Sequence, residues 1–481
     1  MKPYSIHWFR RDLRIAGNPA LEKSFTKSKG RVVGFFSFDS SFLAREDFSH
    51  TRFQFFLNTL KALKEELKSV GSDLLVLDKM PDEAFLLLLK NLSHPPEQVS
   101  WNRDYEPFAR KRDAKIETLL KENKVDVVTE SDHLLIEPVE FLSFSEKKTP
   151  YQIYTPFSKI WLRFLKEKQI KNRVARQASG LKYLEKKASG KSEKIFSLSW
   201  SDLIVKKSGM DDALDSFIQK NAKHVSIPIP KAGSLEAFQK MEEFKEKLKN
   251  YSTARDIPSI AGTSQFSIFF KNGSLTTTQV IQHLKLDSSQ SEGAKKFLNE
   301  LIWREFYYHI LYHFPHVEKK CFKQAYDALK WENNPKYFEA WKEGKTGYHI
   351  VDAGMRQLNA TGWMHNRVRM IVASFLTKDL LVDWRWGEQY FMEKLIDGDL
   401  APNNGGWQWS ASTGCDAQPY FRIFNPSSQS EKFDPQGLYI KKWVPETKDF
   451  DYKQIHSPKN PIVDHSIQRE KALTMYKTAR A

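Results

Sequence analysis

The chain has 481 residues, which is too long for one ordinary hydrophobic core, so we expect two or three domains. Lys and Arg outnumber Asp and Glu by 75 to 59, and the net charge of +16 favours a polyanionic partner without establishing one. No apolar run approaches the ~18 residues of a membrane span, the first residues lack the apolar core of a signal peptide, and the two cysteines have no metal-ligand spacing. We therefore expect a cytoplasmic monomer with no membrane partner, no bound metal and no disulfide framework.

Five short apolar runs alternate with amphipathic segments over the first 130 residues. Apolar residues recur at three- and four-residue spacing in 52–70, 82–92 and 110–122, which predicts helices. The runs that predict strands, each bounded by polar or turn residues, are 5–9, 32–38, 74–77, 98–101 and 126–128. This alternation predicts an α/β domain over residues 1–132, built on a five-stranded parallel doubly wound sheet. No GxGxxG follows the first strand, so the dinucleotide-binding fingerprint is absent.

The next segment, residues 133–205, is interpreted as an interdomain linker. Its stretch from Lys171 to Lys194 is rich in Lys, Arg, Ser and Gly, a composition typical of a solvated connection. From residue 206 to 481 the pattern becomes helical, and the sequence predicts an all-helical domain. Helical spacing is clearest in 295–314, 347–359, 366–377 and 387–396.

Residues 397–425 form the most unusual stretch of this second domain. Its first thirteen residues contain two Asp, two Asn, two consecutive Gly and two Trp. Because Gly, Asn, Asp and Pro interrupt both helical and strand periodicity, we expect an irregular loop. Glycines allow close backbone approach, Asp and Asn offer hydrogen-bond partners, and indoles offer flat faces, so the loop suits a bound aromatic cofactor. The alternative is a rigid buried turn whose Trp side chains fill the core.

Three other patterns suggest chemistry but do not decide it. The segment 262–267 holds a Gly, three hydroxyl residues and a Gln, which suit a diphosphate but also cap helices. Glu300, Trp303 and Arg304 lie at i, i+3 and i+4 of a predicted helix, so they share one face; a surface salt bridge beside a core Trp has the same spacing. Trp331 and Trp384 lie in separate segments from Trp407, and by spacing alone all three are core residues.

These motifs resemble the DNA photolyase/cryptochrome family, and specifically its class I cyclobutane pyrimidine dimer photolyases. The resemblance runs from the segment 7–14 (HWFRRDLR) through 397–409 to Phe424, Asn425 and Pro426, which is nearly the whole chain. It implies that the helical domain binds FAD, active as FADH⁻, and that the N-terminal domain carries a light-harvesting antenna. The implied activity is light-driven splitting of pyrimidine dimers, and the implied partner is damaged DNA.

The resemblance also implies a role for each matching residue. Those implied in catalysis at the lesion are Glu300, Trp303, Asn366, Met370 and Trp409. Those implied in electron transfer to the flavin are Trp407, Trp384 and the outer Trp331. Those implied in FAD binding are Tyr251, Thr263, Ser264, Gln265, Phe266, Ser267, Arg304, Arg369, Asp397, Gly398, Asp399 and Asn403, with Arg369 paired to Asp397. Those implied in DNA binding are Arg255, Glu300, Trp303, Asn366, Arg367 and Gln429.

Several positions distinguish members of the family. The (6-4) photolyases carry histidines at the positions of Asn366 and Met370, and plant cryptochromes carry Asp at the position of Asn403, so this chain favours a cyclobutane dimer photolyase. A signalling cryptochrome, a (6-4) photolyase and an electron-transfer flavoprotein are the alternatives. Folate-binding members carry a Glu in the segment where this chain reads Pro107 to Arg110, and Ala109 cannot bind a pterin through a hydrogen bond. The sequence therefore leaves open whether a second chromophore binds and which one it is.

Overall fold

The computed structural model describes residues 2–191, 193–206 and 208–479, which form two compact units. The first unit consists of Met1–Lys148, Lys159–Glu246 and Ser264–Gln290; the second consists of Thr149–Ser158, Lys247–Thr263 and Ser291–Ala481. These units differ from the predicted ranges, since residues 206–246 and 264–290 group with the N-terminal part of the chain. Residues 149–158, predicted to lie in the linker, group with the helical part.

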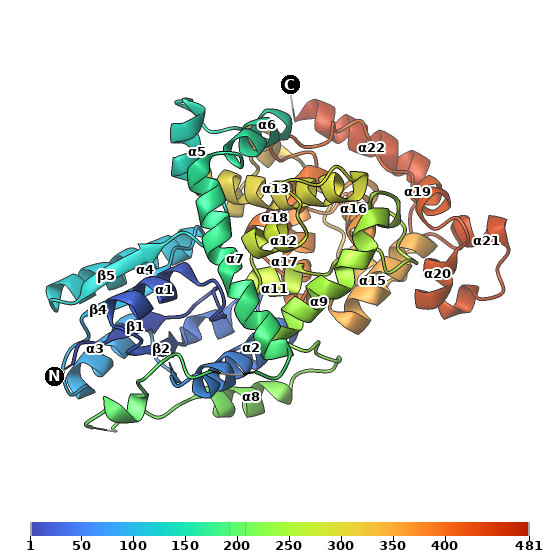
Figure 1. Ribbon diagram of the computed structural model, residues 1–481. Helices are drawn as coiled ribbons and strands as arrows, with labels where there is room; N and C mark the ends of the chain where they lie inside the picture. The colour runs from blue at the N-terminus through green and yellow to red at the C-terminus, as the bar shows by residue number, and fades with distance from the viewer. Residues whose placement is uncertain (1, 192, 207, 480–481) are drawn as a thin grey trace. The chain divides into compact units, whose positions relative to one another are not determined.

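A five-stranded parallel sheet forms the centre of the first unit (Figure 1). Its strands are β1 (Ser5–Trp8), β2 (Val32–Ser37), β3 (Leu74–Leu77), β4 (Gln98–Asn102) and β5 (Asp126–Glu130). They lie in the order β3-β2-β1-β4-β5, and Ile6 of β1 lies opposite Val33 on one side and Val99 on the other. The predicted doubly wound sheet is confirmed.

Alternate residues of the strands pack against helices on opposite faces of the sheet, as the two-residue period of a strand requires. In β2, Val33 and Phe35 pack with buried residues of α3 and α4, whereas Val32 and Phe36 pack with those of α2 and α8. The helices of the first unit are α1 (Pro19–Lys27), α2 (His50–Ser69), α3 (Pro81–Asn91), α4 (Pro107–Glu122), α5 (Pro138–Ser145), α7 (Lys168–Ala188), α8 (Leu214–Ala222), α11 (Ser267–Asn272), α12 (Thr277–His283) and most of α9 (Ser234–Lys247).

Over residues 168–188, helix α7 takes the place of the irregular connection that composition predicted, whereas the described residues from 189 to 199 have no helix or strand. Ile170, Val174, Leu181 and Leu184 recur at helical spacing inside the lysine-rich stretch, and all four are buried. The apolar face therefore folds the segment against the first unit, and the lysines occupy the remaining surface.

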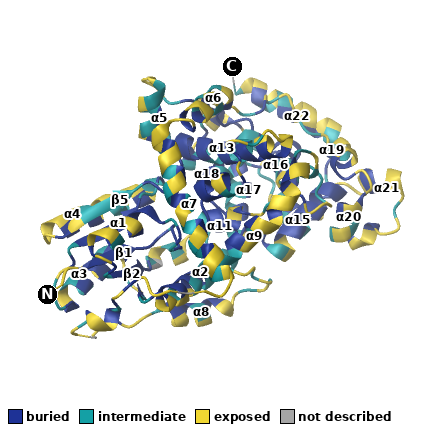
Figure 2. Cartoon of the chain, in the orientation of Figure 1, coloured by how far each residue is buried: buried dark blue, intermediate teal, exposed yellow. Residues whose placement is uncertain are grey.

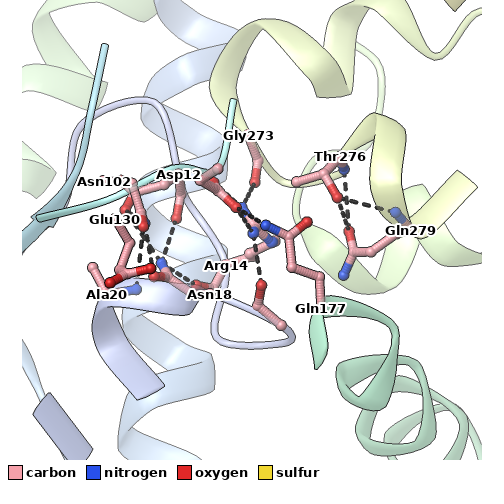
Figure 3. Close-up of polar contacts among 12 residues, drawn as sticks. Asp12, Arg14, Asn18, Ala20, Asn102, Glu130, Gln177, Gly273, Thr276 and Gln279 are labelled. Carbon is pink, nitrogen blue, oxygen red and sulfur yellow. Dashed lines mark hydrogen bonds and ion pairs between the residues drawn. The ribbon is translucent and has the colours of Figure 1, made fainter. Parts of the chain in front are cut away.

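A fully buried ion pair between Arg14 and Asp132 ties this helix region to the loop after β1. Figure 3 shows Arg14 with its neighbours Gln177 and Gly273. The Arg14 guanidinium donates to both carboxylate oxygens of Asp132, at 2.9 and 2.5 Å, and to the carbonyl oxygen of Gly273 at 3.0 Å. Gln177 of α7 donates its amide to Asp132 at 3.2 Å. Every charge in this cluster has a partner, which is the condition under which buried charges are tolerated.

The second unit is built from helices, as predicted. They are α10 (Tyr251–Ala254), α13 (Glu292–His313), α14 (Pro335–Glu343), α15 (His349–Thr361), α16 (Asn366–Ser374), α17 (Trp384–Lys394), α18 (Leu400–Ser410), α19 (Pro426–Phe433), α20 (Leu438–Trp443), α21 (Tyr452–His456) and α22 (His465–Thr478). Helix α6 (Tyr154–Phe164) contributes residues to both units. One extensive apolar cluster of the second unit joins α15, α16 and α17 with α20 and α22.

The expectation of an irregular loop was wrong for residues 400–410, whereas residues 411–425 have no helix or strand, as expected. Residues 400–410 form helix α18, although they include Pro402 and two consecutive glycines. Packing decides this: a Cβ on Gly405 would lie 2.1 Å from the Tyr307 ring, so the glycine is needed for α18 to approach α13. The close approach of two helices outweighs the low helix propensity of the segment.

Two further findings concern the whole described chain. Cys321 and Cys415 are both buried and free. None of the helices that the structure describes has the length and apolar character needed to cross a bilayer.

Candidate functional site

The acidic residues before α18 are each held by a cation or a hydroxyl of a neighbouring helix. Arg369 of α16 donates from Nη2 to the two carboxylate oxygens of Asp397, at 3.1 and 2.9 Å, which is the pairing that the resemblance implied. Asp399 accepts from the Tyr308 hydroxyl at 2.6 and 2.7 Å, and Arg304 Nη2 lies 3.8 Å from its Oδ2. Both carboxylates are buried, so they hold fixed positions at the start of α18.

Helix α18 contacts α13, α16 and α17 and presents polar groups between them. The Asn403 amide donates to the carbonyl oxygen of Glu388 at 3.1 Å, which orients the side chain. A Cβ on Gly406 would meet no atom of the described residues within 4 Å, in contrast to the tight contact at Gly405. Gly398 lies in the turn before the helix, and Trp409 is half-buried near its end.

One face of α13 carries Glu300 and Trp303, as their spacing predicted. Glu300 forms an ion pair with Arg255, whose guanidinium lies 5.5 Å from the centre of the Tyr251 ring. Trp303 is half-buried, and the Tyr154 ring lies parallel to it at 3.6 Å with an interplanar angle of 3°. The Tyr154 hydroxyl donates to Oδ1 of Asn299 at 2.6 Å. Tyr154 thus fixes the plane of the Trp303 indole.

Tyr154 is a site residue that the sequence reading missed. It lies in the segment 149–157, which was placed in the linker. Its partners Asn299 and Trp303 are about 145 residues away in sequence, and the three residues belong to the same compact unit. An aromatic segment with two prolines inside a supposed linker was the available signal.

Helix α16 begins at His365, whose Nδ1 accepts from the backbone N–H of Arg367 at 3.1 Å. Burial lowers the pKa of His365 to about 4, so this cap is a neutral imidazole. Arg367 pairs with Asp256 at 2.8 Å, and its guanidinium lies 4.2 Å from the centre of the Phe433 ring. The Met370 sulfur lies 3.9 Å from the exposed Asn366 amide and 3.8 Å from Arg367 Nη1. Asn366, Arg367 and Met370 are therefore brought together.

The three tryptophans of the predicted electron-transfer set belong to one hydrophobic cluster. Trp384 and Trp407 are buried, and Trp331 packs against the cluster while half-buried. Trp407 meets Phe391 edge-to-face at 4.9 Å, and Trp331 meets Tyr476 at 6.3 Å. The ring contacts within the described residues include no direct contact between two of the three. The Trp407 indole N–H is buried and has no described hydrogen-bond partner.

The predicted diphosphate segment is divided between the two units. Tyr251 and Thr263 belong to the second unit, and Ser264 to Ser267 belong to the first. Within the first unit, the Ser264 hydroxyl accepts from the Phe266 backbone at 3.4 Å, and Phe266 is buried. Gln429, predicted to contact DNA, is half-buried on α19. The structure thus gathers most of the predicted residues in the second unit, without assigning the diphosphate segment to it.

Comparison with known proteins shows the family to which this chain belongs. Residues 5–175 match the family model described as DNA photolyase, and residues 297–478 match the model described as the FAD binding domain of DNA photolyase. A relative from Vibrio cholerae, named deoxyribodipyrimidine photo-lyase, is 37% identical, covering 98% of this chain and 99% of its own. The chain belongs to the DNA photolyase family.

Solved structures of the family agree with the fold. A bacterial class III photolyase from Agrobacterium tumefaciens superposes with a TM-score of 0.82 at 32% identity, covering 100% of this chain and 98% of its own. An archaeal photolyase from Sulfolobus tokodaii, solved with two FAD molecules, gives a TM-score of 0.79 at 32% identity, covering 98% of this chain and 99% of its own. This chain therefore has the α/β domain and the helical domain of the photolyase fold.

The residues of the second unit fit the family's cofactor, FAD. The fixed carboxylates of Asp397 and Asp399, the Asn403 amide and the Arg369 guanidinium supply acceptors and donors for a heterocycle edge. Gly406 adds no side chain to the surface of α18 beside them.

Proposed function

We propose that this protein is a deoxyribodipyrimidine photo-lyase that splits cyclobutane pyrimidine dimers in DNA under light. The observation that carries the proposal is the face of α13, where the Glu300 carboxylate lies one turn from a Trp303 indole that Tyr154 holds in plane. A carboxylate accepts from the imide N–H of a pyrimidine, and a fixed indole stacks on its ring. The family relationship supports the proposal at the level of DNA photolyase, and the substrate and class I assignment are our inference.

The protein's own residues bind and orient the lesion. Glu300 accepts from the damaged base and stabilises the charge that develops on it, while Trp303 stacks against it. Asn366 and Met370 lie together on α16, and their side chains suit a cyclobutane dimer better than the two histidines of (6-4) photolyases do. Bound reduced FAD supplies a light-excited electron donor, and the electron returns after two carbon–carbon bonds break, so the reaction is redox-neutral.

Arg255 and Arg367 are proposed to contact the DNA backbone. Each is paired with a carboxylate, Glu300 for Arg255 and Asp256 for Arg367. The Asp256 side chain is 36% exposed, so a phosphate can replace it at little desolvation cost. The dimer is proposed to leave the duplex, because an enzyme that acts on individual bases in DNA must take them out of the base stack.

The repair assay tests substrate and class together. The purified protein is incubated with one oligonucleotide carrying a cyclobutane thymine dimer and one carrying a (6-4) product, under blue light and in the dark. We expect repair of the first substrate in the light only. Repair in the dark contradicts a photolyase, and preference for the (6-4) product contradicts the class I assignment.

Trp407, Trp384 and Trp331 are proposed to carry electrons from the surface to oxidised flavin. Two of them are buried and Trp331 is half-exposed, as such a path requires. We expect Trp407→Phe to block photoreduction, with a packing cost of about 1–3 kcal/mol. Repair by protein whose flavin was reduced chemically beforehand should persist, because the repair cycle returns its own electron. Unchanged photoreduction in the variant would return all three residues to a purely structural role.

An antenna chromophore in the first unit is also proposed, without a chemical identity. Ala109 is buried on α4 and offers no hydrogen-bonding group to a pterin. In the Sulfolobus tokodaii photolyase, the presence of two FAD molecules implies a novel light-harvesting cofactor for that protein. An absorption spectrum of the purified protein, taken before and after denaturation, distinguishes FAD alone from FAD with a second chromophore.

A further inference from the structure

A strong concentration of positive charge lies around helix α7, in a segment that contains none of the site residues assigned above. Residues 159–194 contain 12 Lys and Arg but only 3 Asp and Glu, a net charge of +9 out of +16 for the whole protein. This segment belongs entirely to the first unit. A positive charge of this size on one segment attracts large negatively charged partners to the first unit.

The lysines of α7 form a stripe on a face turned by about 130° from the centre of its buried face. The buried side chains include Ile170, Val174, Leu181 and Leu184. At 100° per residue, four exposed lysines fall within about 60° of each other on the other side of the helix. The members of this lysine stripe are Lys168, Lys171, Lys182 and Lys186. Figure 2 shows exposed residues recurring along α7.

The lysines of the stripe are unpaired, whereas other cations of α7 are engaged. Arg173 pairs with Glu140 at 2.9 Å and Arg176 with Glu130 at 3.2 Å, and Lys187 lies 3.6 Å from Glu66. No ion pair joins a stripe lysine to any residue in the described ranges. The charge of the stripe is therefore available to an external partner.

Helix α7 holds this stripe in a fixed orientation. A Cβ on Gly17 would lie 2.1 Å from the Gln177 carbonyl oxygen, and a Cβ on Gly180 would lie 2.2 Å from the Gly17 backbone nitrogen. Backbone thus packs directly on backbone, and the Gln177 amide, labelled in Figure 3, donates to buried Asp132 at 3.2 Å. A rigid array of charges loses little conformational entropy when it binds a rigid polyanion.

The shape of the stripe fits an extended polyanion. Lys168 and Lys186 are 18 residues apart, which is about 27 Å along the helix, or about eight base pairs of duplex DNA. Between the two lysine pairs the exposed face carries the small side chains of Ala175 and Ser179. A membrane-binding helix would carry exposed aromatic or large aliphatic residues beside its lysines, and this stretch of the face has none among the described residues.

From this arrangement we propose that the lysine stripe of α7 is a second DNA-binding surface, which contacts the phosphate backbone of duplex DNA without reading its sequence. The identity of the polyanion rests on the proposed function, since a photolyase encounters mostly undamaged duplex. The stripe contributes to this encounter binding, whereas the residues of the second unit recognise the lesion.

The test compares two fourfold Lys→Ala variants of the full-length protein. The stripe variant changes all four stripe lysines. The control variant changes four exposed lysines on α2, α3 and α4 that have no ion pair in the described structure: Lys61, Lys68, Lys90 and Lys111. Both variants lose four charges from helix surfaces. Circular dichroism and thermal unfolding establish that both are folded.

Affinity for an undamaged duplex is measured by fluorescence anisotropy between 50 and 300 mM salt. Each lost phosphate contact reduces the slope of log K against log salt by about 0.9, so we expect the stripe variant to lose about 2–4 units of slope. At 100 mM salt we expect about tenfold weaker binding than for the control variant. Repair at saturating DNA should equal that of the wild type.

Equal slopes for the two variants would overturn the proposal, because general charge would then explain the binding. Loss of binding to phosphatidylglycerol vesicles with unchanged DNA binding would overturn it in favour of a membrane surface. Failure of the wild type to repair any dimer in light would overturn the proposed function. The salt-slope measurement needs no light, so it would still show whether the lysine stripe binds DNA.

Discussion

One ion pair of the first unit and two ion pairs of the second unit differ in how far they are exposed to water. In the first unit, the Arg14 and Asp132 side chains are 0% and 2% exposed, and they bond to each other, to the Gly273 carbonyl oxygen and to the Gln177 amide. In the second unit, Arg255 and Glu300 are 17% and 30% exposed, and Arg367 and Asp256 are 20% and 36% exposed. A dry, fully satisfied pair holds elements together, whereas a pair that stays near water can exchange its carboxylate for a ligand phosphate. The difference separates residues that maintain the fold from residues that bind.

Arg14→Ala should have the largest effect on stability. Burial raises the pKa of Asp132 even with Arg14 beside it, and loss of the guanidinium leaves this carboxylate without its cation. We expect the free energy of unfolding in urea to fall by about 3–5 kcal/mol. The control is Lys121→Ala, which removes an exposed pair with Glu117 and should cost no more than about 0.5 kcal/mol. Similar losses in the two variants would remove the distinction between buried and exposed pairs.

Lys378, a fully buried lysine of the second unit, tests whether that unit also keeps a charge away from water. Lys378 donates to the Ser412 hydroxyl at 2.9 Å, and burial lowers its pKa to about 7. Between pH 7 and 10.5 the unfolded chain binds a proton that the folded protein has released, so stability should rise with pH in this window. We expect a gain of about 1–3 kcal/mol from pH 7 to 9, because one pKa unit corresponds to about 1.4 kcal/mol.

The measurement is urea unfolding at pH 7, 8 and 9 for the wild type and Lys378→Met. The variant lacks the titrating group and should show a flatter profile. Parallel profiles would mean that Lys378 remains protonated when folded, and the second unit would then tolerate a buried charge as the first unit does.

Two adjacent glycines of α18 test whether packing or helix propensity determines the stability of this helix. Gly405→Ala places a Cβ 2.1 Å from the Tyr307 ring, and we expect it to reduce the unfolding free energy by about 1–3 kcal/mol. Gly406→Ala meets no atom in the described part of the chain and should raise helix stability by about 0.5–1 kcal/mol. Urea unfolding of the flavin-free protein measures both. Effects of the same sign would show that propensity dominates at this helix.

Arg367→Ala should have a small effect on stability and a clear effect on binding. Its partner Asp256 is 36% exposed and can be hydrated, so the unfolding free energy should change by about 1 kcal/mol or less. The slope of log K against log salt for DNA binding should fall by about 0.9. An unchanged slope together with a large loss of stability would assign Arg367 to the structural class of Arg14.

The local sequence pattern was sufficient to predict an element where the periodicity of the segment matches the face that it buries. The apolar run of β2, bounded by polar and turn residues, predicted a strand inside the sheet, and it pairs on both sides. The face shared by Glu300 and Trp303 followed from the pitch of a helix alone. The Arg369–Asp397 pair was expected only from the family resemblance, because the two residues are 28 positions apart in sequence.

The sequence by itself therefore determined the α/β and helical classes, the positions of most elements and the residue types of the candidate site. Tertiary structure decided that residues 400–410 are helical, because Gly405 packs on Tyr307, and that the lysine-rich stretch is a helix with one buried face. It also decided that Tyr154 stacks on Trp303 and that residues 264–290 belong with the sheet. Each of these depends on contacts between residues far apart in sequence, and local propensities carry no information about such contacts.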